Sequence, residues 1–234
     1  MTKVFSVLTF VAAVIFAISP FLTDGFRGFT ANQFPFPQTN PPVQPAGYAF
    51  SIWGVLYIWL IISTAYGLLK KSNSASWINA RPALFVSLAV GASWIAIAQV
   101  SVVWATVLIW VMLVFALAAL LKSGSDDRWL LRESIGAYAG WLTAASCVAL
   151  GLVIAGYGYT SQTTAAFIGL GLALIIAAAI QKARPDTVSY PLVVIWALTG
   201  VIFSNLEPLN TGVIVLCGVG IAYLARAVVA PKLR

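Results

Sequence analysis

The chain has 234 residues, of which 61% are hydrophobic and only 8% are charged, and its formal net charge at pH 7 is +7. A soluble domain carries about 25% charged residues, so this composition excludes a water-soluble fold and indicates a polytopic membrane protein. In such a protein basic residues gather in short loops and orient the helices, so the positive charge does not predict nucleic-acid binding.

The apolar runs define the predicted spans. The first run, 4–22, has a feature of a signal peptide, the small-x-small sequence 17-AIS-19, but cleavage there would leave Pro20 as the first mature residue. Signal peptidases disfavour proline at that position, so we expect a retained helix. The run 83–121 carries no charge and makes about 58 Å of helix, twice the hydrocarbon thickness, which predicts two spans turning near 99-QVSVVW-104. An all-α transmembrane bundle of about eight spans follows when the remaining runs are added: 48–69, 131–156, 162–181, 188–206 and 211–230.

The distribution of basic residues tests this topology. With the N-terminus in the cytoplasm, twelve of the thirteen Lys and Arg fall in cytoplasmic segments, and only Arg27 falls outside. The bias follows the positive-inside rule, and it is lost if 83–121 is a single span, because every later loop then changes side. We therefore predict that both termini are cytoplasmic and that the chain is a multi-pass protein of the bacterial inner membrane.

One long loop is predicted on the outer side, 23-TDGFRGFTANQFPFPQTNPPVQPAG-47. Its prolines favour a stiff, extended backbone, and its Phe side chains favour contact with the bundle. Two interpretations remain open. The loop is a lid over the bundle, or it rests at the membrane interface.

Small residues recur at a spacing of four, which lets helix backbones approach closely in a membrane. Such faces serve either packing within the bundle or contacts between protomers. Cys147 and Cys217 lie inside apolar runs, and we interpret both as small core residues. The small-residue pairs are Gly136 with Gly140, Gly151 with Ala155, Gly169 with Ala173, and Gly218 with Ala222.

No Asp, Glu, Lys or Arg lies near the middle of a predicted span, and the chain has no histidine. Arg132 is expected at an inner helix end, where its side chain would snorkel to the interface. Glu207, in the turn 205-NLEPLN-210, is expected to be a solvated acid. General acid–base catalysis needs a positioned titratable group, so we predict no catalytic residue and no metal site. A proton pump or an intramembrane hydrolase is disfavoured for the same reason.

Aromatic residues are abundant, with 9 Trp, 8 Tyr and 13 Phe. Several fall at predicted helix ends, where aromatic rings commonly anchor a helix at the membrane interface. We expect this role for Trp77, Trp104, Trp129, Tyr48 and Phe50.

Other aromatic residues lie deeper in the predicted spans. Trp53 and Tyr57 share one helix face, and Tyr138 and Trp141 share another. Their buried N–H and O–H groups need partners, which neighbouring helices or a bound ligand would supply. Composition alone favours helix packing, although flat aromatic walls with a few donors also suit a planar hydrophobic ligand.

Two segments carry a family resemblance. The segment 45-PAGYAFSIWGVLY-57 resembles the second-helix signature of the TspO / translocator-protein family, the tryptophan-rich sensory proteins, and 138-YAGWLTAA-145 is similar to their fifth-helix pattern. The resemblance implies a five-helix bundle over 1–156 and a three-helix extension over 157–234. The chain departs from the family pattern at Ala137 and Ala149, where Pro and Asn are usual, and its outer loop has no Trp.

The resemblance implies an integral membrane receptor or carrier that binds a hydrophobic planar ligand, either a tetrapyrrole (porphyrin) or a sterol-like molecule, in a sensory or transport role. The alternative is an accessory structural subunit of a larger membrane complex, including a pigment-binding one.

We expect no enzyme activity, and a porphyrin-degrading activity is the least favoured hypothesis. No cofactor is certain, and a bound tetrapyrrole or lipid is the candidate. The expected partners are a hydrophobic small molecule, membrane lipids, and a homo-oligomer or larger complex, but not nucleic acid. The implied ligand pocket is lined by Trp53, Tyr57, Trp94, Trp110, Tyr138 and Trp141.

Overall fold

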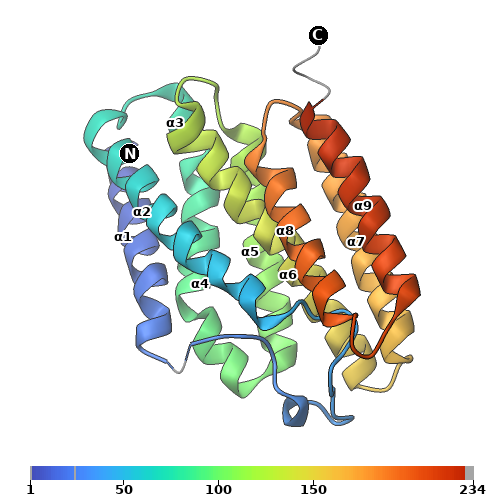
Figure 1. Cartoon of the computed structure of the whole chain (residues 1–234). Coiled ribbons are helices and arrows are strands. Elements are labelled where there is room, and N and C mark those ends of the chain that lie inside the picture. The colour runs from blue at the N-terminus through green and yellow to red at the C-terminus, as the bar shows by residue number, and fades with distance from the viewer. Residues whose placement is uncertain (1, 24, 230–234) are drawn as a thin grey trace.

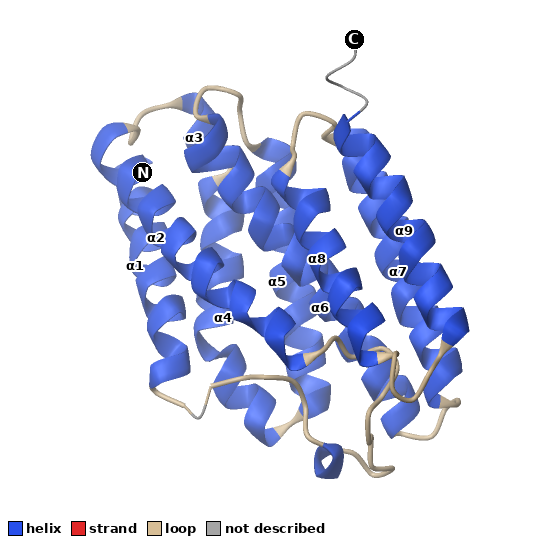
Figure 2. Ribbon diagram, viewed as in Figure 1, coloured by secondary structure: helices blue, strands red, loops and turns tan. Residues whose placement is uncertain are grey.

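The computed structural model describes residues 2–23 and 25–229, and no strand occurs in these ranges (Figure 2). The all-α prediction is confirmed for this part of the chain. Short helical turns, among them η3 (Gly47–Ser51) and η4 (Arg128–Arg132), precede α2 and α6. The helices are α1 (Thr2–Ile18), α2 (Ile52–Lys70), α3 (Ala75–Ile78), α4 (Arg81–Val100), α5 (Val102–Lys122), α6 (Glu133–Gly156), α7 (Gln162–Ala183), α8 (Ser189–Ser204) and α9 (Thr211–Val229).

The helices have the length and composition of membrane spans. Six segments of the described chain are long and apolar enough to cross a bilayer, and two shorter apolar helices, Ser189–Ser204 and Thr211–Arg226, accompany them. The predicted break in the run 83–121 is confirmed, because α4 ends at Val100 and α5 begins at Val102. Ser101 is extended between them, and its hydroxyl caps α5 by accepting the backbone N–H of Trp104 at 3.3 Å.

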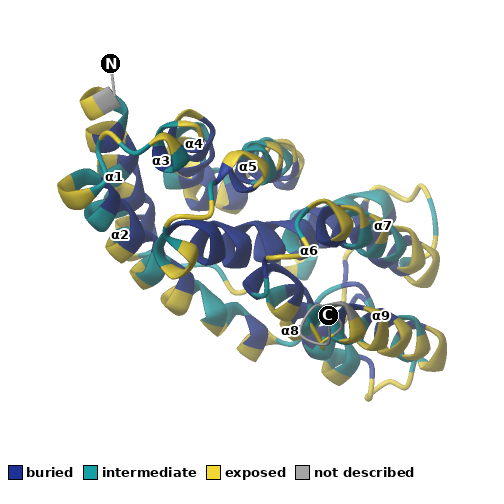
Figure 3. Ribbon diagram, turned by 90° about the horizontal axis from the view of Figure 1, so that it is seen from above, coloured by how far each residue is buried: buried dark blue, intermediate teal, exposed yellow. Residues whose placement is uncertain are grey.

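Helix α6 is the centre of the bundle. It packs against α5, α7, α8 and α2, and most of its residues are buried (Figure 3). A Cβ at Gly140 would lie 2.5 Å from the carbonyl oxygen of Tyr190 on α8, and one at Gly169 would lie 2.7 Å from the carbonyl oxygen of Cys147. These glycines therefore serve packing within the bundle, as small residues do between membrane helices. Gly218 has no such neighbour among the described residues.

The two ends of the bundle differ in charge. The start of α1 and the end of α9 lie at one end, together with the α2–α4, α5–α6 and α7–α8 connections, and we call this the inner end (Figure 1). The 23–47 loop crosses the opposite, outer end and carries Arg27. The common position of the start of α1 and the end of α9 agrees with the predicted topology. The assignment of the inner end to the cytoplasm rests on its basic residues.

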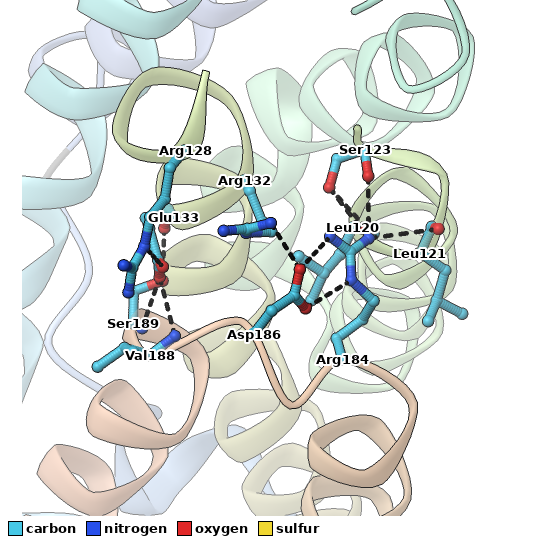
Figure 4. Close-up of polar contacts among 10 residues, drawn as sticks. All are labelled: Leu120, Leu121, Ser123, Arg128, Arg132, Glu133, Arg184, Asp186, Val188 and Ser189. Atoms are coloured by element: carbon cyan, nitrogen blue, oxygen red, sulfur yellow. Dashed lines mark hydrogen bonds and ion pairs between the residues drawn. The ribbon is translucent and has the colours of Figure 1, made fainter. Parts of the chain in front are cut away.

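Glu133 joins α6 to the start of α8 at the inner end (Figure 4). Its carboxylate is fully buried, accepts the backbone N–H groups of Val188 and Ser189 at 3.0 and 2.8 Å, and pairs with Arg128 at 3.0 Å. The first N–H groups of a helix have no partner within that helix and favour a negative charge. Glu133 therefore caps α8 and fixes its end against α6.

Asp186 is a residue of the α7–α8 loop. It pairs with Arg132 of η4 and with Arg184 of the same loop (Figure 4). Arg184 also donates to the carbonyl oxygens of Leu120 and Ser123 at the end of α5. Burial by itself would raise the pKa of Asp186, but the hydrogen bond and charge of Arg184 and the charge of Arg132 outweigh it and lower the pKa. Arg132 is only 7% exposed, so the expectation that it snorkels is wrong, because Asp186 holds it inside.

Two of the helix-end tryptophans are exposed, as expected of interface anchors: Trp104 at 64% and Trp129 at 61%. Trp77 is different, because it is 2% exposed and its indole Nε1 donates to Asp127 at 2.8 Å. Its ring lies over Gly67 of α2, where no Cβ would fit. The prediction of an anchor at Trp77 is wrong, because α3 folds back onto the bundle and buries the ring.

Candidate functional site

The 23–47 loop is fastened to several helices of the outer end. The backbone N–H of Phe36 donates to the carbonyl of Gly156 at 2.9 Å, and Gln33 Nε2 donates to the carbonyl of Ala98 at 2.8 Å. On the other side, the N–H of Ala46 donates to the carbonyl of Gly200 on α8 at 2.9 Å. These bonds hold the loop across the outer end of the bundle.

An apolar cavity lies beneath this loop and reaches between α4, α5, α6, α7 and α8. We call it the main cavity; its volume is about 40 Å³. None of the described residues that line it carries a charge. The loop contributes Phe26, Gly28, Phe29, Gln44 and Pro45; the helical segments contribute Phe50, Trp94, Ile109, Trp141, Ala144, Ala145, Cys147, Val148, Ala149, Leu152, Leu170, Ala173, Val194, Ala197, Leu198 and Val201.

A second, aromatic chamber adjoins the main cavity towards α1 and α2. We call it the side cavity; its volume is about 90 Å³. It shares the side chains of Phe26, Phe50 and Trp94 with the main cavity, so these three rings form the common wall. The residues around it are Pro20, Phe26, Phe50, Trp53, Tyr57, Trp94 and Ile95.

Ring contacts hold the walls in place. Trp53 stacks on Tyr57 with centroids 5.3 Å apart, and it meets the edge of Trp141 at 6.0 Å. Phe50 contacts Trp141 at 5.7 Å, and Phe26 from the loop contacts Trp94 at 4.7 Å. Edge-to-face and offset stacked pairs are the favoured aromatic geometries. The loop and three helices are thereby joined through one aromatic cluster.

Four of the six predicted pocket residues lie around these cavities: Trp53 and Tyr57 at the side cavity, Trp141 at the main cavity, and Trp94 at both. Each of the two signature segments contributes, since α2 provides Trp53 and Tyr57 and α6 provides Trp141. The i, i+4 spacing of Trp53 and Tyr57 places both rings on one face, as the sequence indicates.

The other two predicted residues line neither cavity. Tyr138 is fully buried, and its hydroxyl hydrogen-bonds Ser87 at 3.0 Å, so it ties α6 to α4. Trp110 is half-buried on α5 and packs against the hydrophobic core. Tyr138 turns away from Trp141 because residues three apart on a helix point about 60° from each other.

Several lining residues were not predicted as pocket residues. Phe50, which the sequence suggests as an interface anchor, is half-buried between Phe26 and Trp141 and lines both cavities. The loop residue Gln44 and the α7 and α8 residues also lie outside the prediction. For these residues the sequence offered one indication: the Phe side chains of the loop favour contact with an apolar surface of the bundle.

Comparison with known proteins identifies the family to which the chain belongs. A model described as TSPO-like protein matches residues 3–230 of this chain. The chain belongs to the TSPO-like protein family. The matched range includes the whole of α7, α8 and α9 along with the preceding helices, and the boundary predicted near residue 156 stays a prediction. No curated protein and no solved structure matches the chain.

Membership of the TSPO-like family and the apolar helices together establish an integral membrane protein. Among the residues that the structure describes, no group of three or more His, Cys, Asp or Glu is placed to hold a metal ion. The clustered charges of the inner end are engaged with helix ends and with one another. The neutral cavities of the outer end are therefore the candidate site of this TSPO-like protein.

Proposed function

We propose that this protein is a membrane receptor or carrier that binds a hydrophobic ligand in the cavities under the 23–47 loop. The observation that carries the proposal is the uncharged, aromatic-walled cavity, built from both family signature segments. Ligand pockets are typically concave and mostly apolar with a few polar groups, and these cavities have that character. A planar tetrapyrrole or a sterol-like ring system is the proposed ligand class.

The size of the cavity sets a condition on binding. The main cavity has a volume of about 40 Å³, which is enough for about three waters. Pockets for drug-sized ligands have volumes of about 300–1,000 Å³. A planar ligand therefore requires the loop to move, and displacement of Phe26 and Phe50 from the common wall would join the two cavities. In this proposal the loop is a lid.

The lining favours binding over catalysis. Tyr57 and Cys147 are the ionisable side chains among the described residues that line the two cavities. Acid–base catalysis needs a titratable group in reach of the reacting atoms, with a pKa near the working pH. Neither a phenol nor a thiol in an apolar wall meets that requirement, so the proposed role is sensing or transport.

Titration of the purified protein with protoporphyrin IX tests the proposal through quenching of Trp fluorescence. Saturable quenching is expected, and the apparent affinity should fall at least about tenfold in Trp141→Phe or Trp94→Phe, because both rings line the cavity. Trp110→Phe is the matched control, since Trp110 lines neither cavity. Quenching no stronger than that of an unrelated membrane protein of similar Trp content would contradict the proposal.

A further inference from the structure

Two polar atoms at the wall of the main cavity have no hydrogen-bond partner among the described residues. They are the indole Nε1 of Trp141, a side chain only 2% exposed, and the amide Oε1 of Gln44. Both side chains line the main cavity. A buried donor or acceptor without a partner is costly, and each such group in a folded protein needs an explanation.

The neighbouring indoles show that the fold supplies partners elsewhere in this region. Trp94, which also lines the main cavity, donates through Nε1 to the carbonyl of Ala105 at 2.8 Å. Trp196 on α8 donates through Nε1 to the carbonyl of Ala49 at 2.9 Å. Trp141 therefore differs from these two indoles, and its side chain, whose N–H has no partner among the described residues, lines the main cavity.

We propose that Trp141 and Gln44 form a polar recognition pair for a neutral ligand that carries one hydroxyl or amide group on an apolar body. An indole N–H only donates and an amide oxygen only accepts, whereas a hydroxyl or an amide does both. One such group accepts from Trp141 and donates to Gln44. The described lining has no charge, so a carboxylate or an ammonium inside the cavity would lose its hydration without a counter-charge, and the propionates of a porphyrin would have to stay outside it.

Gln44 has a second feature that fits this role. Gln44 and Pro45 line both the main cavity and an open outer pocket of about 500 Å³, so they form the partition between the two. The hydroxyl of Ser204 on α8 holds the backbone carbonyl of Gln44 at 2.7 Å. Gly28 leaves room for the amide, since a Cβ there would lie 2.9 Å from Gln44 Nε2. The lid itself therefore brings the acceptor of the pair to the ligand.

The inference rests on the proposed function, because the pair recognises a ligand only if the cavity binds one. Three probes with the same naphthalene ring system separate the two questions: 2-naphthol donates and accepts, 2-methoxynaphthalene only accepts, and naphthalene does neither. The full chain in lipid nanodiscs is titrated with each probe, and dissociation constants come from the concentration dependence of the unfolding temperature. We expect 2-naphthol to bind about three- to tenfold more tightly than 2-methoxynaphthalene.

The variants locate this preference. Gln44→Leu removes the acceptor and should reduce the preference for 2-naphthol over 2-methoxynaphthalene to less than twofold. Trp141→Phe removes the donor, from which both oxygen-bearing probes accept, and should reduce the preference for 2-methoxynaphthalene over naphthalene to less than twofold. Trp110→Phe should retain both preferences. Gln44 lies in a loop, so its variant keeps the test decisive if Trp141→Phe does not fold. Equal binding of the three probes to the unmodified chain, or an unchanged preference in Gln44→Leu, overturns the recognition pair while the proposed function stands. Absence of binding by all three probes and by protoporphyrin IX overturns both.

Discussion

The inner and outer ends of this bundle differ in how their polar and charged groups are paired. At the inner end, Glu133 and Asp186 are paired with arginines, and Glu133 also accepts helix N–H groups. At the outer end, the cavity under the loop has no charge in its described lining and leaves Trp141 Nε1 unpaired. The difference supports the proposed function, in which the inner end stabilises the helix packing and the outer end binds a ligand.

The comparison is not a simple contrast of paired and unpaired groups. Three buried atoms near the inner end, Arg132 Nε, Thr187 Oγ1 and Gln181 Oε1, also have no partner among the described residues. None of them belongs to the lining of the main or the side cavity. The outer end is distinguished by the presence of unpaired polar atoms on the wall of an apolar cavity.

The largest expected effect is at Glu133. Glu133→Ala leaves two N–H groups of α8 and Arg128 without their acceptor, and we expect a loss of about 3 kcal/mol in the free energy of unfolding. Glu133→Gln keeps one acceptor oxygen and should lose less. Thermal unfolding in detergent measures both variants, and equal stability of Glu133→Ala and the unmodified chain would show that the inner end does not hold α8.

Arg184 should have the next largest effect. Arg184→Met removes the donor to the α5 carbonyl groups and one partner of Asp186, with an expected cost of about 2 kcal/mol. Lys182→Met is the matched control, because Lys182 is an exposed basic residue two positions earlier in the chain. A similar loss in both variants would mean that net charge, rather than the Arg184 contacts, stabilises this end.

At the outer end, two tryptophans of the same cavity form a direct comparison. Trp94→Phe removes a hydrogen bond to Ala105, whereas Trp141→Phe removes an N–H that has no partner among the described residues. We expect Trp94→Phe to cost about 1 kcal/mol more than Trp141→Phe in ligand-free protein. The unfolding free energies of the two variants test this, and the reverse order would indicate that Trp141 has a partner in the free protein.

The smallest effect is a dependence on pH at the inner end. The folded-state pKa of Asp186 is lower than its ordinary value of 3.8, so its stabilising contribution is present above about pH 4 and is lost as pH falls through the folded-state pKa. Unfolding temperatures measured from pH 7 to pH 3 should therefore fall more steeply for the unmodified chain than for Asp186→Asn. Parallel curves would show that Asp186 contributes nothing to the acid sensitivity.

Part of the candidate site was predictable because it depends on local spacing. Trp53 and Tyr57 are one helical turn apart on the same helix, so they share a wall wherever the helix lies. The same reasoning paired Tyr138 with Trp141, but these side chains diverge and only Trp141 reaches the cavity. Trp77 is a second case in which local sequence was not sufficient. A position near a helix end does not show whether the connecting segment folds back onto the bundle.

The sequence by itself determined the long helices, the break near residue 101, the common position of the start of α1 and the end of α9, and the family. Each of these follows from apolar length, charge placement or a local motif, all of which are properties of neighbouring residues. Only the tertiary structure decided that α7 and α8 complete the cavity, that Gln44 reaches its wall, and that Trp141 keeps a free N–H. Those facts depend on contacts between segments distant in the chain, such as the bond from Ser204 to Gln44, which local patterns do not encode.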